Sequence, residues 1–165
     1  MDGGKRMVQI LPLTGHHERQ GFDCGDEDLN HWLRHVARQH KAKGVSSTYV
    51  AVEAESSTVI LGFYAINVTE IIGENLPPSW RKKLPEKIPA FRIGRLAVVK
   101  DIQGKQLGSL LLADALSRIR RVALEVGGTI VLVDAKPSAV GFYQKFGFEL
   151  LADHPRNLFL PIWDE

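Results

Sequence analysis

The most regularly patterned part of the chain is residues 91–148. An apolar run over residues 91–99 (FRIGRLAVV) predicts a strand, and the leucine-rich segment over residues 109–126 predicts a helix. The turn DIQGKQLG, residues 101–108, joins them. A helix that begins after such a turn presents unpaired backbone N–H groups and the positive end of its dipole. This turn is therefore predicted to bind phosphate.

Shorter elements flank this stretch. Apolar and β-branched runs predict further strands at residues 8–13, 47–52, 58–71, 129–134, 148–151 and 157–160. The polar turn at residues 53–57 predicts a hairpin, and the segment AVGFYQKFGF predicts a short helix. Four prolines between residues 73 and 89 predict a long connection with at most one helical turn. The order β-α-β-β-loop-β-α-β-α-β-β predicts a mixed α/β sheet in a single domain over residues 1–165.

One amphipathic helix is predicted after the acidic residues 26–28, which suit a first helical turn. The apolar residues at i, i+3, i+4 and i+7 are Leu29, Trp32, Leu33 and Val36. The cations Arg34, Arg38 and Lys41 are predicted to share the opposite face. The helix should therefore lie on the surface with a basic exterior.

Composition limits the class of protein. The 165 residues fit one domain, and 44% hydrophobic with 24% charged residues is ordinary for a soluble globular protein. No apolar run approaches the ~18 residues of a membrane span, and the N-terminus lacks a signal-peptide pattern. With Cys24 as the only cysteine, an internal disulfide is excluded. We expect a cytoplasmic protein.

The formal net charge of +2 hides two concentrated basic segments. Residues 31–43 contain four cations and no acid, and residues 81–95 contain six cations against Glu86. Such segments indicate a polyanionic partner, although solvated faces with scattered lysines give the same pattern. Few aromatic residues accompany the cations, so recognition of a nucleic acid through its shape and backbone is favoured over base stacking.

The glycine turn matches neither the P-loop nor the Rossmann pattern. Together with the later segment AVGFYQKFGF it resembles the GNAT superfamily of acetyl-CoA-dependent N-acetyltransferases. That family's loop reads [QR]-x-x-G-x-[GA], and its later segment reads A-x-x-[FY]-Y-x-x-x-G-F. Gln103 and Gly108 match the loop ends, whereas Gln106 replaces a glycine and Lys136 replaces a common asparagine. A backbone N–H can still serve at Gln106 if φ is negative.

Further segments resemble one branch of that family, the TacT-type toxins that acetylate the amino group of aminoacyl-tRNA. They are FDCG followed by LNxWL, GRLAV at residues 94–98, VDAK at residues 133–136 and LxLP at residues 158–161. The resemblance implies a GNAT fold, a mostly antiparallel sheet of six to seven strands with splayed central strands and flanking helices. It also implies a homodimer and a ribbon-helix-helix antitoxin through which a toxin–antitoxin complex binds operator DNA.

The implied chemistry is direct transfer from acetyl-CoA, with no metal, while acetyl-pantetheine lies between the splayed strands. The residues implied to bind this co-substrate are Leu96, Ala97, Val98, Gln103, Gly104, Lys105, Gln106, Leu107, Gly108, Ser109 and Phe142. Among them, the N–H groups of residues 96–98 are expected to stabilise the oxyanion. Tyr143 is the candidate general acid, because a phenol with a pKa of about 10 is protonated at neutral pH. The alternative is a tyrosine that only packs beside Phe142.

An aminoacyl-tRNA contributes phosphates around the reactive amine. The candidate tRNA contacts are Arg81, Lys82, Lys83, Lys87, Arg92, Arg95, Arg34, Arg38 and Lys41. Arg95 has two interpretations, since the Gly-Arg-Leu-Ala motif can use it structurally or against the acceptor end.

Two other functions stay open on the sequence alone. One is a GNAT enzyme that acetylates a protein or a small-molecule amine, and the other is a pseudo-enzyme that binds CoA or nucleic acid without transfer.

His31 and His35 have i, i+4 spacing but lack the glutamate of an HExxH zinc site. Cys24 is interpreted as a packing residue.

Overall fold

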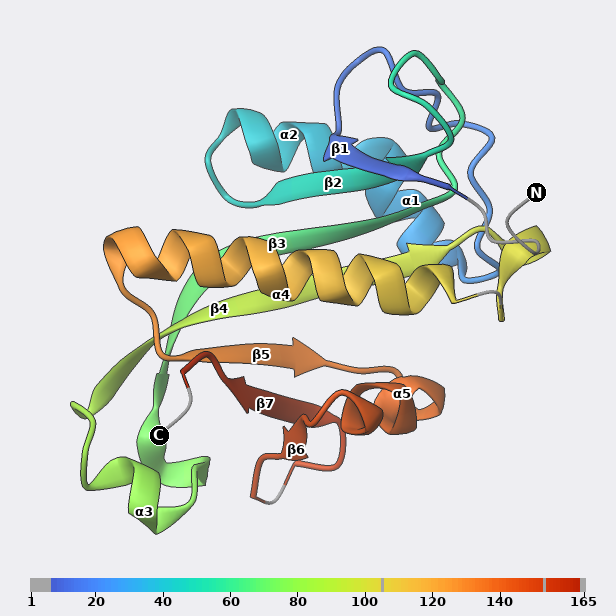
Figure 1. Ribbon diagram of the computed structural model, residues 1–165. Helices are drawn as coiled ribbons and strands as arrows, with labels where there is room; N and C mark the ends of the chain where they lie inside the picture. Colours follow the sequence, from blue (N-terminus) through green and yellow to red (C-terminus); the bar gives the residue numbers. More distant parts are fainter. Residues whose placement is uncertain (1–6, 105, 153, 164–165) are drawn as a thin grey trace. The chain divides into compact units, whose positions relative to one another are not determined.

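The computed structural model describes residues 7–104, 106–152 and 154–163. The chain forms two compact units, Met1–Ile66 with Arg95–Ala115 and Asn67–Gly94 with Leu116–Glu165. Strands β3 and β4 and helix α4 each run through both units (Figure 1). The two units are therefore described one at a time.

Seven strands form one sheet in the order β1-β2-β3-β4-β5-β7-β6. The strands are β1 (Gln9–Pro12), β2 (Ser47–Val52), β3 (Gly62–Ile72), β4 (Lys87–Val98), β5 (Ile130–Asp134), β6 (Glu149–Leu150) and β7 (Asn157–Pro161). The helices are α1 (Glu27–His35), α2 (Ala37–Ala42), α3 (Pro78–Arg81), α4 (Leu107–Val126) and α5 (Val140–Lys145). Short 3₁₀ turns cover Gly73–Asn75, Lys100–Ile102 and Pro137–Ala139. The predicted mixed α/β class and the order of elements are confirmed.

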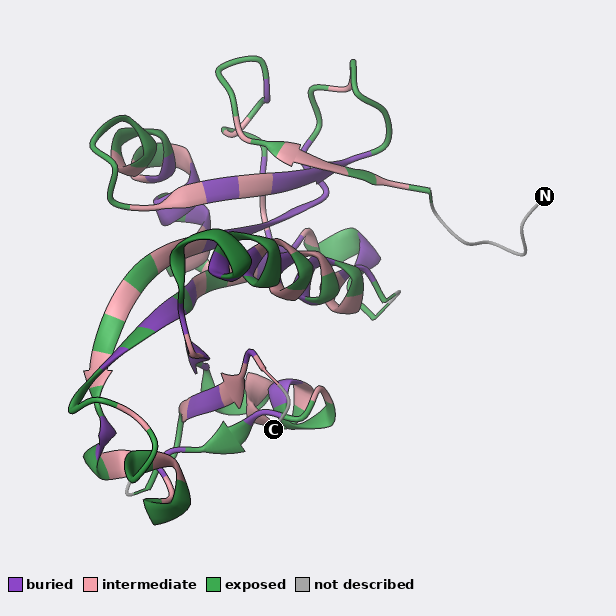
Figure 2. Ribbon diagram, turned by 60° about the vertical axis from the view of Figure 1, so that its left-hand side comes forward, coloured by how far each residue is buried: buried purple, intermediate pink, exposed green. Residues whose placement is uncertain are grey.

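The predicted hairpin forms the centre of the first unit. Strand β2 pairs antiparallel with β3 from Ser47↔Ile66 to Ala51↔Gly62, and β1 pairs antiparallel with its other edge. Figure 2 shows β2 largely buried. Helix α4 lies close to β3, because a Cβ atom at Gly62 would stand 2.8 Å from Leu111 Cδ1. Glycine at this position lets the first turns of α4 pack directly on the strand.

The prediction of one continuous helix after residue 28 is wrong. Asp26 caps α1 by accepting from the N–H groups of Asp28 and Leu29, but α1 ends at His35 and α2 begins at Ala37. Between them Val36 has φ −116°, which interrupts the helical register. The apolar stripe is still correct, since Trp32 and Leu33 are buried in the core.

The second unit holds the end of the sheet that contains β5, β6 and β7. Strand β5 pairs antiparallel with β7 from Ile130↔Pro161 to Asp134↔Asn157, and β6 pairs with β7. The connection between β3 and β4 includes α3, as the predicted single helical turn requires. Trp80 of α3 packs edge to face on Phe159 of β7, with ring centroids 6.4 Å apart. This contact anchors the connection to the core.

The two central strands pair over only part of their length. Strand β5 is parallel to β4 from Ala90↔Ile130 to Ile93↔Val133. In the described residues the pairing of β4 with β5 ends at Ile93, although β4 continues to Val98. A pairing that stops before the strand ends is what splayed central strands require.

None of the helices in the described residues has the length and apolar character to cross a membrane.

Candidate functional site

The predicted phosphate turn connects β4 to α4 in the first unit. The 3₁₀ turn Lys100–Ile102 follows β4, and Gln103 comes next. The Gln103 side-chain Nε2 donates to the backbone carbonyls of Val98 (2.9 Å) and Cys24 (2.7 Å). The Gln103 side chain therefore fixes the turn to the end of β4 and to the segment before α1. This role of the side chain was not predicted.

Gln106 has φ +68°, the left-handed conformation that glycine adopts most readily. The condition of a negative φ is therefore not met. The backbone of Gln106 instead has the conformation expected of a glycine, and the glutamine side chain is exposed. A left-handed conformation costs a non-glycine residue about 1–2 kcal/mol. The turn thus contains a small amount of backbone strain.

The first turn of α4 leaves backbone donors available. The N–H of Leu110 donates to the carbonyl of Gln106 over 3.1 Å, the first bond of this helix. Within the described residues, the N–H groups of Leu107, Gly108 and Ser109 have no protein acceptor. Such donors lie at the positive end of a twenty-residue helix. N–H groups in this position can bind a phosphate group.

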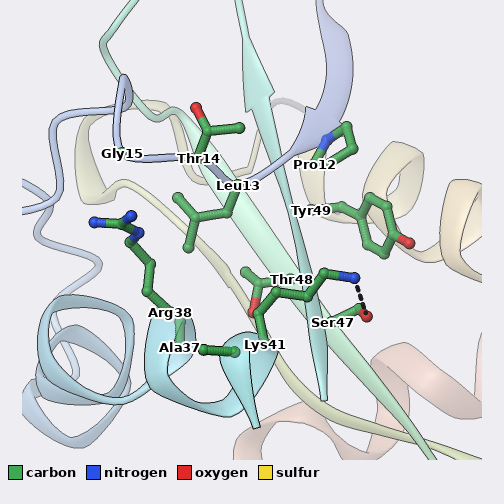
Figure 3. A pocket seen from close by; sticks show the side chains of 11 residues that line it. Pro12, Leu13, Thr14, Gly15, Ala37, Arg38, Lys41, Ser47, Thr48 and Tyr49 are labelled. Atoms are coloured by element: carbon green, nitrogen blue, oxygen red, sulfur yellow. Dashed lines mark hydrogen bonds between the residues drawn. The ribbon is translucent and has the colours of Figure 1, made fainter. Parts of the chain in front are cut away.

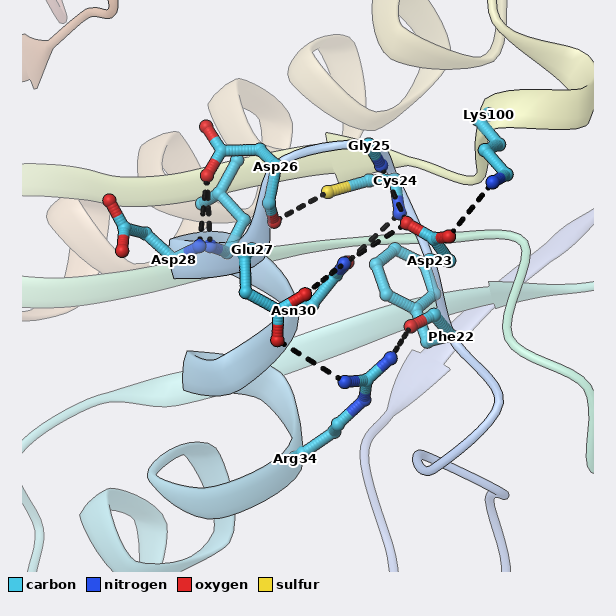
Figure 4. A network of polar contacts seen from close by, with 11 residues as sticks. Phe22, Asp23, Cys24, Gly25, Asp26, Glu27, Asp28, Asn30, Arg34 and Lys100 are labelled. Carbon is cyan, nitrogen blue, oxygen red and sulfur yellow. Dashed lines mark hydrogen bonds and ion pairs between the residues drawn. The ribbon is translucent and has the colours of Figure 1, made fainter.

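A polar network holds the segment before α1 against this turn (Figure 4). The Asp23 carboxylate accepts from the N–H of Gly25 (2.8 Å) and from Asn30 Nδ2 (3.1 Å). Its other oxygen pairs with Lys100 Nζ at 3.0 Å. The Gly25 hydrogen bond first, and then those of Lys100 and Asn30, lower the pKa of Asp23 to about 2. The backbone N–H of Cys24 donates to Asn30 Oδ1 (2.9 Å), so the buried side-chain amide of Asn30 connects α1 to the segment before it.

Tyr143 lies in the second unit, on α5. It is buried, with Phe142 and Phe148 packed edge to face at centroid distances of 5.2 and 5.6 Å. Burial raises the pKa of Tyr143 to about 12. Within the described residues its hydroxyl has no hydrogen-bond partner. The hydroxyl oxygen is not fully buried, so it keeps some solvent-accessible surface. The phenol thus stays protonated at neutral pH and is free of a competing protein acceptor in this part of the chain.

The remaining residues predicted to bind acetyl-CoA divide between the units. Residues 96–98 form the end of β4 in the first unit, with Ala97 and Val98 buried. Gly104 has φ +82° in the turn. Phe142 lies on α5 beside Tyr143 in the second unit. Lys105 lies outside the described residues.

Arg34 does not join the other candidate tRNA contacts. Its Nη2 donates to the carbonyl of Phe22 (2.5 Å), and its Nη1 lies 3.5 Å from Glu27 Oε1. Both partners of the guanidinium belong to the first unit, Phe22 in the loop before α1 and Glu27 on α1. The other candidates are exposed. They are Arg38, Lys41 and Arg95 in the first unit, and Arg81, Lys82, Lys83, Lys87 and Arg92 in the second.

Arg95 lies over the ring of Trp32, with its guanidinium carbon 5.2 Å from the ring centroid. This cation–π contact orients the arginine from α1. The rings of His31 and His35 are 4.7 Å apart. No group of three or more metal-ligating side chains is found in the part of the chain that the structure describes.

Residues 20–157 match the family described as acetyltransferase (GNAT) domain. The chain belongs to the GNAT acetyltransferase family. It is 32% identical to a protein named "Probable toxin TacT" from Sinorhizobium fredii, over 96% of this chain and 92% of that protein. It is also 32% identical to a tRNA-acetylating toxin from Mycobacterium tuberculosis, over 87% and 85% of the two chains.

Solved structures agree with this assignment. A tyrosine-to-phenylalanine mutant of KacT superposes with a TM-score of 0.89 at 27% identity, covering 94% of this chain and 95% of that one. AtaT complexed with acetyl-methionyl-tRNAfMet gives 0.85 at 32% identity with the same coverage. A mutant AtaT bound to acetyl-CoA and to the C-terminus of the antitoxin AtaR gives 0.78 at 29% identity, covering 94% and 93%. The predicted GNAT fold is confirmed.

Proposed function

We propose that this GNAT enzyme transfers the acetyl group of acetyl-CoA to the α-amino group of aminoacyl-tRNA and so blocks translation as a toxin. The observation that carries the proposal is the likeness, at 32% identity and over 94% of this chain, to AtaT in complex with an acetylated aminoacyl-tRNA. The tRNA-acetylating relative supports the same reaction. The open alternatives, a protein or small-molecule acceptor and a pseudo-enzyme, have no comparable support.

The donors at the start of α4 hold the diphosphate of the co-substrate. When bound, acetyl-CoA supplies an activated acetyl thioester. Backbone N–H groups of Leu107, Gly108 and Ser109 point along a helix dipole, and the Gln103 side chain fixes the turn that leads to them. Backbone N–H groups of residues 96–98 stabilise the negative charge that develops on the acetyl oxygen. Phe142 and the remaining turn residues complete the proposed contacts.

Tyr143 donates a proton to the departing thiolate of CoA. Its raised pKa keeps the phenol protonated, and its ring is held by two neighbouring phenylalanines. A strong general base is not required, because the ester of an aminoacyl-tRNA lowers the pKa of its amino group. The neutral amine is then available at physiological pH.

The exposed cations bind the tRNA backbone. In the first unit these are Arg38, Lys41 and Arg95, and in the second they are Arg81, Lys82, Lys83, Lys87 and Arg92. Arg34 is excluded from this set because Phe22 and Glu27 already occupy its guanidinium. The contacts are with phosphates, so binding should weaken as salt rises.

The biological setting is part of the same proposal. A cognate ribbon-helix-helix antitoxin neutralises the enzyme, and the toxin–antitoxin complex binds operator DNA through the antitoxin. The catalytic chain acts as one domain over residues 1–165, as a homodimer, and in the cytoplasm, where aminoacyl-tRNA is found. The structure of a mutant AtaT bound to the C-terminus of its antitoxin supports the part of the proposal that an antitoxin binds this chain.

The test is incubation of the purified protein with labelled acetyl-CoA and a charged tRNA pool. We expect label on tRNA that mild alkali releases as N-acetyl amino acid, and the labelled amino acid identifies the accepted tRNA. Label that appears on protein or on free amines while charged tRNA stays unlabelled would replace this function with the small-molecule or protein alternative.

A further inference from the structure

Trp32 connects α1 to three other elements of the first unit. Its side chain is 7% exposed, and its ring stacks nearly parallel to that of Phe63 on β3, with centroids 6.0 Å apart and 8° between the planes. The ring of His40 on α2 meets it edge to face at 5.9 Å. The guanidinium carbon of Arg95 on β4 lies 5.2 Å from its centroid. Because Phe63 is fully buried, the core fixes the orientation of the tryptophan ring.

Arg95 is exposed, although the ring on which it lies is buried. A guanidinium donates its hydrogen bonds in its own plane, so an aromatic ring against one face does not compete for them. A phosphate at the edge of the guanidinium can accept two parallel N–H bonds. The structural and the binding interpretation of Arg95 are therefore compatible, since the ring uses the face and an anion uses the edge.

Arg95 also lies beside the strand segment proposed to stabilise the acetyl oxygen. It directly precedes residues 96–98 on β4, where successive residues are about 3.3 Å apart. The pairing of β4 with β5 has already ended at Ile93. Arg95 and Ala97 point to the same face of the strand, and Ala97 packs in the core cluster that contains Trp32. The guanidinium is therefore within one side-chain length of the segment proposed to hold the thioester.

We propose that Trp32 is a positioning residue that holds Arg95 for the 5′-phosphate of the terminal nucleotide of aminoacyl-tRNA. One ribose separates this phosphate from the ester that carries the reactive amine, so it is the phosphate nearest to the acyl transfer. A cation fixed beside residues 96–98 binds this phosphate and thereby places the amine. The inference rests on the proposed function and assigns one particular phosphate to one of the candidate cations.

The cations of α2 are held by other contacts. Arg38 and Lys41 line a cavity of about 280 Å³ beside β2 (Figure 3). Figure 3 shows the Arg38 guanidinium beside Gly15 and the Lys41 ammonium hydrogen-bonded to Ser47. Because neither contact involves Trp32, replacement of the tryptophan should leave both cations in place. Its effect should therefore be confined to the end of the acceptor strand.

The most informative substrate is an aminoacyl-adenosine in which an amide replaces the labile ester, prepared with and without a 5′-phosphate. The wild type should acetylate the phosphorylated compound with a kcat/KM about tenfold higher, the contribution of a charge-assisted hydrogen bond. Arg95→Ala should abolish this preference. Trp32→Leu should lower it from about tenfold to about threefold, the loss expected of a cation–π contact. Trp32→Phe, which keeps an aromatic face, should restore most of it.

A double-mutant cycle separates positioning from general stability. Added to Arg95→Ala, Trp32→Leu should not change the preference further, because the tryptophan acts through the arginine. The preference is a ratio measured on one enzyme preparation, so partial unfolding of a variant does not alter it. A matched control is the pair in the second unit in which Arg120 lies over Trp163 at 5.6 Å. Trp163→Leu and Arg120→Ala should keep the tenfold preference.

Two results would overturn the inference. A preference that persists in Arg95→Ala would show that another group binds the terminal phosphate, and a full preference in Trp32→Leu would show that the tryptophan does not position the arginine. If the wild type acetylates neither compound, the coupling is measured as the affinity for deacylated tRNA by fluorescence anisotropy. Non-additive losses in Trp32→Leu and Arg95→Ala would then support the positioning role, and additive losses would refute it. Failure to acetylate charged tRNA as well would refute the proposed function separately.

Discussion

The side-chain amide of Gln103 donates to the backbone carbonyl of Cys24 over 2.7 Å, a contact between residues 79 positions apart in the sequence. The same nitrogen bonds the carbonyl of Val98. One side chain therefore fixes the phosphate turn to both the central strand and the segment before α1.

Gln103→Ala should separate the turn from its supports. We expect the free energy of unfolding to fall by about 1 kcal/mol, because two partly buried carbonyl groups lose their donor. Acetyl-CoA should also bind more weakly, since the N–H groups after the turn are no longer held in place. Chemical denaturation and calorimetric titration with acetyl-CoA measure the two effects. Gln20→Ala, at an exposed position away from the turn, is the control; equal stability of both variants would show that the contacts do not support the turn.

Gln106 and Gly104 both have a left-handed backbone conformation. Substitutions at these two positions should therefore change the stability of the protein in opposite directions. Gln106→Gly should stabilise the protein by about 0.5–1 kcal/mol, because glycine adopts a φ of +68° without steric cost. Gly104→Ala should destabilise it by about 1 kcal/mol, since its φ of +82° is strained for alanine even though no atom lies within 4 Å. Thermal unfolding of both variants measures the difference. A destabilised Gln106→Gly variant would contradict the observed conformation.

The Asp23 carboxylate should make the free energy of unfolding depend on pH. Its pKa is about 2 in the folded chain against an ordinary 3.8, so its stabilising effect is present above pH 4 and is lost as the pH falls through 2. Asp23→Asn should therefore be less stable than the wild type at pH 7, and the difference should shrink toward pH 2. Urea unfolding at several pH values measures it. Glu125→Gln, at an exposed position on α4, should show no such convergence, and a constant deficit in Asp23→Asn would argue against an ionised carboxylate.

Much of this fold could be predicted because its signals are local. The β2–β3 hairpin, the strand–turn–helix around residues 91–126 and the order of elements follow from hydrophobic period and turn residues. The break at Val36 could not be predicted, since neither glycine nor proline marks it. The contact that Arg34 makes could not be predicted either, because the carbonyl of Phe22 that accepts from it belongs to a loop. Its position on a helical wheel gives no sign of that contact.

The candidate site also has parts that the sequence predicted and parts that it did not. The turn and Tyr143 were identified from motifs, and their roles as binding and catalytic residues stay predictions. The supporting contacts of the Gln103 side chain and of Lys100 were not predicted, because both join segments that are distant in the sequence.

The central claim is that this chain acetylates aminoacyl-tRNA with Tyr143 as the proton donor. The most direct measurement is single-turnover transfer from labelled acetyl-CoA to charged tRNA by the wild type and by Tyr143→Phe. We predict an unchanged fold and unchanged acetyl-CoA affinity, with transfer slowed by about 10²–10⁴-fold, the usual contribution of a general acid. Transfer by Tyr143→Phe at the wild-type rate, or no transfer to tRNA by the wild type, would contradict this.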